Sequence, residues 1–153
     1  MPAMIYQSPI GPLYIAEEEG AITHLLFSPP AGDGDLGESP LLKACAQQLT
    51  AYFDGSLQTF DLPLNPRGTA FQKRVWQALQ TIPYGETWSY KALAEKAGSP
   101  RGFRAVGLAN NRNPISILIP CHRVVGISGG LTGYGGGLDN KAYLLTLEGA
   151  RLG

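Results

Sequence analysis

A short linker, Asn65-Pro66-Arg67-Gly68, divides the chain into two halves of opposite charge, and this division limits the folds available. Residues 1–64 contain one basic and eight acidic residues, whereas residues 65–153 contain eleven basic and four acidic ones. The 153 residues can form one ordinary domain or two small ones. We therefore expect two domains, 1–64 and 65–153, the basic one meeting a polyanion. An electrostatic contact between the halves is the alternative interpretation.

Composition excludes several classes of protein. No apolar run approaches the ~20 residues of a membrane-spanning helix, and the N-terminal residues show no signal-peptide pattern. Two cysteines, Cys45 and Cys121, are too few for a disulfide framework, which favours a reducing cytoplasm. Two Cys and two His without CxxC spacing predict no metal site.

The first half has the pattern of a small α+β unit. Ser39 as N-cap and Pro40 at the first helical position predict a helix, with Cys45 and Tyr52 on its apolar stripe. Cys45 is therefore predicted to be a packing residue. Strand-like patterns occur in four runs: residues 4–8, 13–17, 21–27 and 60–64.

The second half opens with helical punctuation. Thr69 followed by Gln72 forms a capping box and predicts a helix. Two short helices then follow, joined at a glycine, the first capped by Ser89 and the second by Ser99. The second of these carries Arg104, and the pair resembles a helix-turn-helix.

The residues suited to chemistry follow these helices. The apolar run 115–119 predicts a buried strand, which Pro120 ends. A thiol, an imidazole and a guanidinium come next: Cys121, His122 and Arg123. A cysteine beside a histidine and a cation at the end of a buried strand is a candidate nucleophile. In extended backbone Cys121 and His122 would point to opposite sides and communicate through a bridging water. The alternative is a core cysteine beside a surface histidine.

The C-terminal region adds a loop and a carboxylate. Seven glycines surround Tyr134 within a run of twelve residues, which suits backbone lying against a flat ligand or a wing-like loop. Asp139 or Asn140 is predicted to cap a last helix. Glu148 lies on the apolar side of that helix in its last turn, where burial and the helix dipole both disfavour an anion. It therefore needs a partner, for which His122 is the candidate, unless it extends to solvent.

The run Pro120-Cys121-His122-Arg123-Val124 resembles the signature of the O6-alkylguanine-DNA alkyltransferases, a family of self-inactivating repair proteins. Arg104-Ala105-Val106-Gly107, Asn113-Pro114 and Glu148-Gly149 occur in the order expected for that family. The resemblance extends from about residue 69 to residue 152 and is highly specific. It implies an α+β fold in which a ribonuclease H-like N-terminal domain precedes a winged helix-turn-helix-like C-terminal domain.

The resemblance also implies a catalytic role for each matching residue. Cys121 would accept the alkyl group of O6-alkylguanine, with O4-alkylthymine as a further candidate substrate. His122 would remove the thiol proton through water, and Glu148 would hold the imidazole. Asn113 would fix the turn before the active-site strand, and Tyr90 would assist departure of the guanine oxygen. No cofactor is expected.

Double-stranded DNA is the partner that the resemblance implies, bound in the minor groove with the target base flipped out. Arg104 would fill the gap in the base stack, and the small residues Ala105 and Gly107 would let the backbones approach. Lys91 and Ser99 would contact phosphate or sugar. The base pocket would be lined by Val124, Tyr134 and Gly135.

Two residues depart from the family pattern, and one of them, Ile127, stands where some members place a polar DNA contact. Gly135 stands where some members have a serine whose hydroxyl meets the guanine oxygen. The resemblance otherwise implies a monomer that reacts once. Two other functions remain open on the residues alone: a transcription regulator that reads a defined duplex sequence, and a Cys-His hydrolase that uses the helices as scaffold.

Overall fold

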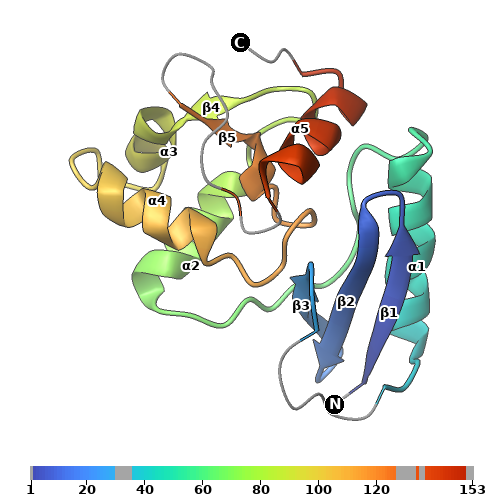
Figure 1. The fold of residues 1–153 in the computed structure, drawn as a ribbon. Coiled ribbons are helices and arrows are strands. Elements are labelled where there is room, and N and C mark those ends of the chain that lie inside the picture. Colours follow the sequence, from blue (N-terminus) through green and yellow to red (C-terminus); the bar gives the residue numbers. More distant parts are fainter. Residues whose placement is uncertain (1, 30–35, 127–133, 135–136, 151–153) are drawn as a thin grey trace.

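A three-stranded antiparallel sheet and one helix form the N-terminal part of the chain (Figure 1). The computed structural model describes residues 2–29, 36–126, 134 and 137–150. The N-terminal elements are β1 (Ala3–Ser8), β2 (Gly11–Glu18), β3 (Ala21–Leu26) and α1 (Pro40–Phe53). The strand order is β1-β2-β3, and α1 packs along one face of the sheet. Three of the four predicted strands and the predicted helix are confirmed.

Helix α1 begins as its sequence predicts. Ser39 Oγ accepts a hydrogen bond from the Leu42 N–H at 3.1 Å, and Pro40 occupies the first helical turn, where its missing N–H costs nothing. The Ser39 hydroxyl in turn donates to Glu17 Oε2 at 2.6 Å and ties the helix to β2. The buried face of α1 consists of Leu42, Cys45, Leu49 and Tyr52.

The strand predicted over residues 60–64 is wrong. This segment makes a single parallel bridge to β3, at Leu64. The Gln48 side chain on α1 instead bonds the backbone of Asp61 twice, at 3.0 and 2.8 Å. Pro63 also has no N–H to offer a ladder. The backbone groups are thus satisfied locally, and the segment stays irregular.

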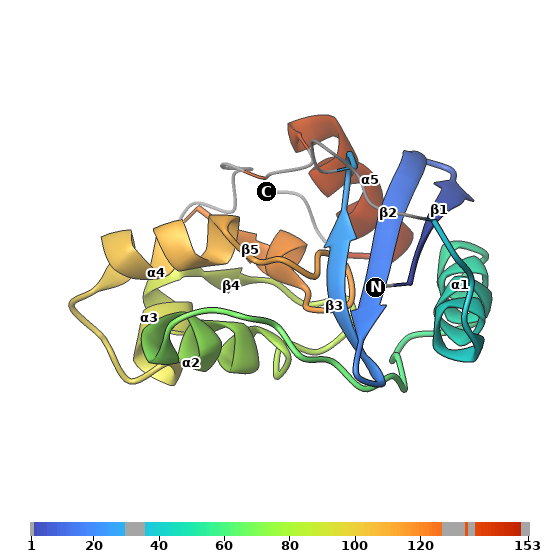
Figure 2. The same ribbon diagram turned by 90° about the horizontal axis from the view of Figure 1, so that it is seen from below.

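Helices surround a two-stranded parallel sheet in the second part of the chain (Figure 2). In chain order its elements are α2 (Ala70–Leu79), β4 (Trp88–Ser89), α3 (Tyr90–Lys96), α4 (Phe103–Asn111), the 3-10 turn η1 (Cys121–Arg123), β5 (Val124–Val125) and α5 (Leu138–Leu147). The capping box of Thr69 and Gln72 is present, with both hydrogen bonds made. Ser89 caps α3 as predicted, and α3 packs on α4 as the helix pair of the motif.

Two predicted helix starts are wrong. Ser99 lies in a turn before α4, where its carbonyl accepts a hydrogen bond from the Gly102 N–H at 2.8 Å, and α4 has no side-chain cap. Helix α5 follows directly on Gly137, whose φ of 92° favours glycine. Neither Asp139 nor Asn140 is therefore the cap. Asp139 lies in the first turn of α5, where its charge suits the helix dipole.

The apolar run before Cys121 is a buried turn, not the strand that was predicted. Ile117 has a positive φ of 72°, and the Ile119 N–H donates to the Ile115 carbonyl at 3.0 Å, so the chain turns back on itself. Ile115 alone joins the N-terminal sheet, as a parallel bridge to Leu25 of β3. The run is apolar because it lies at the junction of the two parts, and a β-branched residue at positive φ stores strain there.

A single hydrophobic core continues across this junction. Buried side chains from the N-terminal sheet and α1 contact those of α2, α3, η1 and α5. Trp76 of α2 is 2% exposed, and its indole N–H donates to the Ala109 carbonyl of α4 at 2.9 Å. The turn of residues 115–119, which leads to Cys121, is therefore packed against both parts of the chain.

Candidate active site

The side chains of Cys121, His122 and Arg123 leave η1 in different directions. Because η1 is a 3-10 turn, consecutive side chains are about 120° apart around its axis. The extended backbone predicted here is therefore wrong. All three side chains are nonetheless buried, with 4%, 0% and 7% of their surfaces exposed. The surface histidine of the alternative interpretation is excluded.

Glu148 ends α5 with its carboxylate surrounded by hydrogen-bond donors. His122 donates from Nε2 to Oε2 at 2.8 Å. Arg123 donates from Nε to Oε1 at 2.8 Å and from Nη2 to Oε2 at 3.0 Å. Tyr52 of α1 donates its hydroxyl to Oε2 at 2.6 Å. The expected contact between Glu148 and His122 is present, and Glu148 does not extend to solvent.

The positive charge of Arg123 balances the negative charge of the Glu148 carboxylate. Burial opposes ionisation of Glu148, but the hydrogen bonds and charges of His122 and Arg123 outweigh it and lower the pKa of Glu148 to about 2. Burial lowers the pKa of His122, and the hydrogen bond to Glu148 offsets this only in part. His122 is therefore neutral at pH 7, with its proton on Nε2 because that atom donates to the carboxylate.

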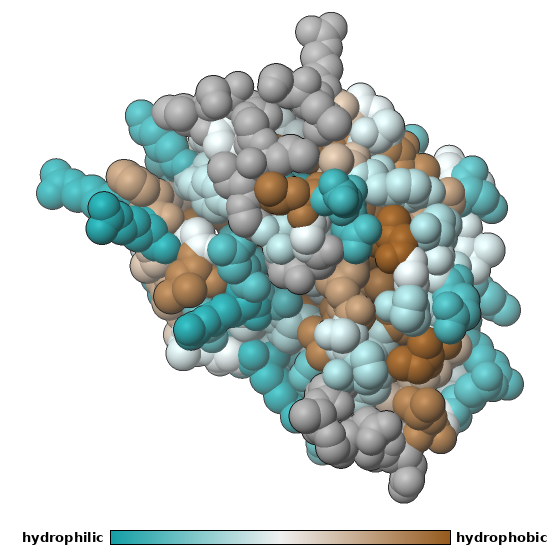
Figure 3. All heavy atoms as spheres, viewed as in Figure 1, coloured by the Kyte–Doolittle hydropathy of each residue, from teal (hydrophilic) through white to brown (hydrophobic). Residues whose placement is uncertain are grey.

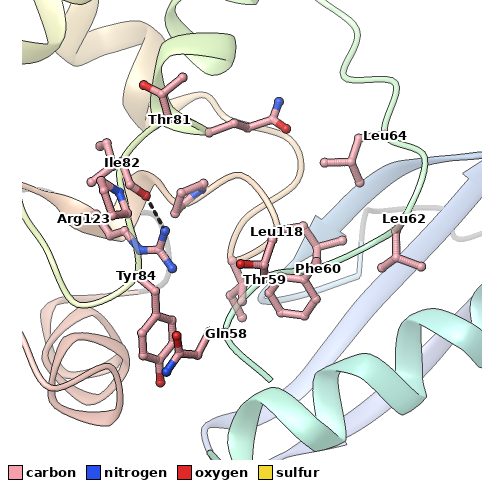
Figure 4. Close-up of a pocket in the computed structure, with 14 residues that line it drawn as sticks. Gln58, Thr59, Phe60, Leu62, Leu64, Thr81, Ile82, Tyr84, Leu118 and Arg123 are labelled. Atoms are coloured by element: carbon pink, nitrogen blue, oxygen red, sulfur yellow. Dashed lines mark hydrogen bonds between the residues drawn. The ribbon is translucent and has the colours of Figure 1, made fainter. Parts of the chain in front are cut away.

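Arg123 is fixed on its other side by backbone and by an aromatic ring. Its Nη1 donates to the Ile82 carbonyl at 2.7 Å, and the guanidinium lies 5.7 Å from the centre of the Tyr84 ring (Figure 4). A cavity of about 220 Å³ opens beside these residues, between the segment around Phe60 and the turn at Leu118. Arg123 forms part of its wall, so this cavity lies on the Glu148 side of η1.

Cys121 faces a different cavity, of about 230 Å³, between α4 and the end of β3. Its lining includes Asn110, Asn113, Ser116 and Tyr134. Asn113 holds the turn before Cys121: its Nδ2 donates to the Ile119 carbonyl at 2.8 Å and its Oδ1 accepts from the Ile115 N–H at 3.0 Å. Within the described residues, three buried polar atoms at or near this cavity lack a hydrogen-bond partner: Asn110 Oδ1, His122 Nδ1 and Tyr134 Oη.

The two cysteines have different electrostatic surroundings. Burial raises the pKa of Cys45, on α1, to about 12. Burial also raises the pKa of Cys121, but the side chains of Asn113 and Ser116 and the charge of Lys141 act in the opposite direction. Only Cys121 has neighbours that favour a thiolate.

Lys141 is a residue that the sequence interpretation missed. It lies on the buried face of α5, is 0% exposed, and has its pKa lowered to about 8 by burial, against the opposing effect of Cys121. It precedes Glu148 by seven residues, two helical turns, so α5 turns a cation and a carboxylate toward η1. That spacing is the signal that could have identified it.

The remaining predicted site residues lie apart from this cluster. Val124 is buried in β5, where it pairs with Trp88 of β4. Tyr90, at the start of α3, packs beside Gly107, where an added Cβ would meet the Tyr90 ring at 3.6 Å. Gly135 falls outside the described residues. The predicted contacts to phosphate or sugar lie at the surface: Lys91 is exposed and Ser99 is half-buried.

Helix α4 presents an exposed, mixed surface. Arg104 and Ala105 are exposed, and two large apolar side chains on the same helix, Phe103 and Leu108, are 54% and 53% exposed. In the surface view, the end of the molecule that carries α3 and α4 bears hydrophilic side chains beside hydrophobic ones (Figure 3). The sequence pattern identified Arg104 but not the two apolar neighbours.

Two absences hold for the part of the chain that the structure describes. None of its helices is both long and apolar enough to cross a membrane. Its His, Cys, Asp and Glu side chains also form no group of three or more that could hold a metal ion.

Comparisons with known proteins match both parts of the chain to one family. Residues 3–66 match the ribonuclease-like domain of 6-O-methylguanine DNA methyltransferase, and residues 70–150 match the DNA binding domain of that family. A methylated-DNA--protein-cysteine methyltransferase from Methanosarcina barkeri is 52% identical over 149 residues, 94% of each chain. One from Mycobacterium leprae is 53% identical over 145 residues, 92% of this chain and 88% of that protein.

A solved structure agrees in three dimensions. The crystal structure of Mycobacterium tuberculosis OGT in complex with DNA superposes with a TM-score of 0.90 at 49% identity, over 97% of this chain and 93% of that one. The resemblance stated from the sequence motifs and the fold that it implies are both confirmed. The chain belongs to the O6-methylguanine DNA methyltransferase family, the methylated-DNA--protein-cysteine methyltransferases.

Proposed function

We propose that the chain repairs alkylated DNA by transferring the alkyl group from O6 of guanine to Sγ of its own Cys121, once and irreversibly. A bond from Sγ to the alkyl carbon forms while the bond from that carbon to O6 breaks, and the electron pair stays on the guanine. The thiol proton passes through a water to Nδ1 of His122. Tyr90 assists the return of a proton to the leaving guanine.

One observation carries this proposal: the two nitrogens of His122 have opposite environments. Nε2 donates to Glu148, whereas Nδ1 is buried and has no partner among the described residues. A neutral imidazole fixed in this way presents a lone pair on Nδ1, one residue from the thiol of Cys121. That is the arrangement of a base held ready to accept a proton.

The chemistry needs no cofactor because a buried thiolate is a soft nucleophile in a closed site. Holding the thiolate in line with the alkyl carbon can contribute about 7–11 kcal/mol toward the barrier. The product is a thioether, and reversal would require a second displacement on carbon with a thiolate as the leaving group. We therefore expect one reaction per chain.

The DNA is a duplex contacted in the minor groove through α4, with the damaged nucleotide flipped into the Cys121 cavity. Arg104 and Ala105 are exposed on α4, and Gly107 of the same helix packs beside the Tyr90 ring. Lys91 and Ser99 would contact phosphate or sugar. The Mycobacterium tuberculosis relative has been crystallised with DNA, which supports the same partner here.

The proposal also covers the flipped base and the setting. Val124, Tyr134 and Gly135 would form the base pocket, with Asn113 holding the turn beneath it. O4-alkylthymine is a second candidate substrate of the same site. The chain would act as a monomer in the cytoplasm, where Cys45 and Cys121, both free thiols, remain reduced.

The test is peptide mass mapping after incubation with a duplex that contains one O6-methylguanine. The wild type and a Cys45→Ser control should each gain a single methyl group, on the peptide that contains Cys121. Cys121→Ser should bind the same duplex and gain none. A methyl group on another residue, or repair of more than one guanine per chain, would overturn the proposal.

A further inference from the structure

Among the described residues, Tyr52 is the side chain of the N-terminal part that hydrogen-bonds Glu148. This tyrosine lies in the last turn of α1, is 0% exposed, and precedes Glu148 by 96 residues. Its hydroxyl donates to Glu148 Oε2 at 2.6 Å, the shortest of the four hydrogen bonds that the carboxylate accepts. Three of those bonds, from Tyr52, His122 and Arg123, end on the same oxygen.

The tyrosine ring is held in place by other aromatic rings. Its centroid lies 5.2 Å from those of Phe53 and Phe60 and 6.4 Å from that of Tyr84. The ring is thus packed on several sides, and its hydroxyl bonds Glu148. Burial, followed by the charge of Glu148, raises the pKa of Tyr52, so the hydroxyl keeps its proton and acts only as a donor.

We propose that Tyr52 is a positioning residue that sets the basicity of His122 through the shared oxygen of Glu148. The inference rests on the proposed function, in which neutral His122 accepts the proton of Cys121. Each donor to Oε2 draws on the same negative charge, so the bond from Tyr52 limits how strongly the carboxylate can stabilise a charged imidazolium. The N-terminal part of the chain thereby takes part in the chemistry.

The sign of the effect follows from this competition. Tyr52→Phe removes a neutral donor and leaves the ring in place. Oε2 then carries more charge, becomes a stronger acceptor for His122, and favours the imidazolium. His122 should therefore be protonated at a higher pH in the variant than in the wild type. The other titratable or charged groups around this cluster are unchanged: Arg123, Lys141, Tyr84, Tyr134 and Cys121.

A buried tyrosine hydroxyl usually has a hydrogen-bond partner, so a purely structural bond must be distinguished from the proposed role. Tyr84→Phe is the matched control. Tyr84 belongs to the same ring cluster, but its hydroxyl donates only a long bond of 3.4 Å to the Leu147 carbonyl. A structural role would lower the melting temperature of Tyr52→Phe without moving the titration of His122.

The experiment compares the wild type, Tyr52→Phe and Tyr84→Phe in two measurements. Nitrogen-detected NMR reads the titration of the His122 imidazole, without substrate. Single-turnover methyl transfer from an O6-methylguanine duplex reads the rate against pH. In Tyr52→Phe we expect the His122 titration and the acid limb of the rate to move up together by about half to one pH unit, slowing transfer about three- to tenfold on that limb. Tyr84→Phe should match the wild type in both.

The two measurements separate the possible failures. An unshifted His122 titration in Tyr52→Phe overturns the role of Tyr52, whatever the melting temperature does. A shift of the same size in Tyr84→Phe also overturns it, because the shared oxygen is then not the cause. A wild type that transfers no methyl group overturns the proposed function, which only the rate measurement tests.

Discussion

The two sides of η1 differ in how well their buried polar groups are satisfied. On the Glu148 side, the carboxylate accepts four hydrogen bonds, and Arg123 makes a further one to the Ile82 carbonyl. Asn110 Oδ1 and Tyr134 Oη, on residues that line the Cys121 cavity, have no partner among the described residues, and neither has His122 Nδ1. His122 connects the two sides, because its Nε2 bonds Glu148 and Cys121 precedes it in η1.

This difference fits the proposed function, in which the Glu148 side is scaffold and the Cys121 cavity holds the reacting groups. An unpartnered buried polar atom costs about 1–3 kcal/mol, so a fold retains several in one place only when something else satisfies them there. A water and a flipped base would do so in the Cys121 cavity. The Glu148 side, fully partnered, holds η1 in position.

Removing the charge of Glu148 should destabilise the hydrogen-bonded cluster around it. Glu148→Gln leaves the Arg123 guanidinium buried without its counter-charge, which typically costs about 3–5 kcal/mol of unfolding free energy. Urea denaturation followed by circular dichroism measures this loss. Glu95→Gln, at an exposed position on α3, is the control and should change stability by less than about 0.5 kcal/mol. A loss below about 1 kcal/mol in Glu148→Gln would show that the cluster does not hold the fold.

Lowering the pH should reduce the free energy of unfolding in two stages, one through His122 and one through Glu148. The folded pKa values of His122 and Glu148 both lie below their unfolded values, 6.5 and 4.5, so the stability these groups supply is complete above pH 6.5 and declines as pH falls. His122 accounts for the first decline. Glu148, with a pKa of about 2, accounts for a second, of about 3 kcal/mol, between pH 4.5 and 2.

Urea midpoints measured across this pH range test the two stages. The pKa of His24 is also lowered by burial, so a His24→Gln background isolates the part due to His122. Stability that stays constant from pH 7 to pH 3 in that background would contradict the assignment of a neutral His122 beside an ionised Glu148.

On the Cys121 side, Lys141 should govern how readily the thiol ionises. Lys141→Met removes a cation that favours the thiolate, so the pKa of Cys121 should rise and the rate with a small alkylating reagent at pH 7 should fall about tenfold per pH unit. Lys43→Met, at an exposed ion pair with Glu38, is the control. An unchanged rate in Lys141→Met would exclude an electrostatic role.

The sequence predicted the two sides unequally. Cys121, His122 and Glu148 were identifiable because a motif surrounds the first two and because a carboxylate on an apolar helix face needs a partner. Tyr52 was indistinguishable from a packing residue, since its stripe on α1 shows only that it is buried. Its hydrogen bond depends on where the end of α5 lies in space relative to α1, which no local pattern specifies.

The fold shows the same limit. Strands β1 to β3, the cap of α1 and the capping box of α2 follow from local patterns, and the structure has them. The apolar composition of residues 115–119 fits a buried strand and a buried turn equally well, because it indicates burial but not the direction of the backbone. The positive φ of Ile117 decides between them, and only the tertiary junction with β3 imposes it.

The smallest expected effect concerns which alkyl groups the unpartnered side accepts. Asn110 is 1% exposed, and its amide lines the cavity beside Cys121 with an unpartnered oxygen. An alkyl group that carries a hydroxyl can satisfy that oxygen, and a methyl group cannot. Asn110→Leu should therefore slow transfer of a 2-hydroxyethyl group relative to a methyl group by about three- to tenfold, the value of one neutral hydrogen bond. Single-turnover rates on the two lesions in the same duplex give the ratio, and the methyl rate is the internal control for altered folding or DNA affinity. A ratio equal to that of the wild type would mean that the Asn110 amide is met by water, and that the cavity distinguishes alkyl groups by size alone.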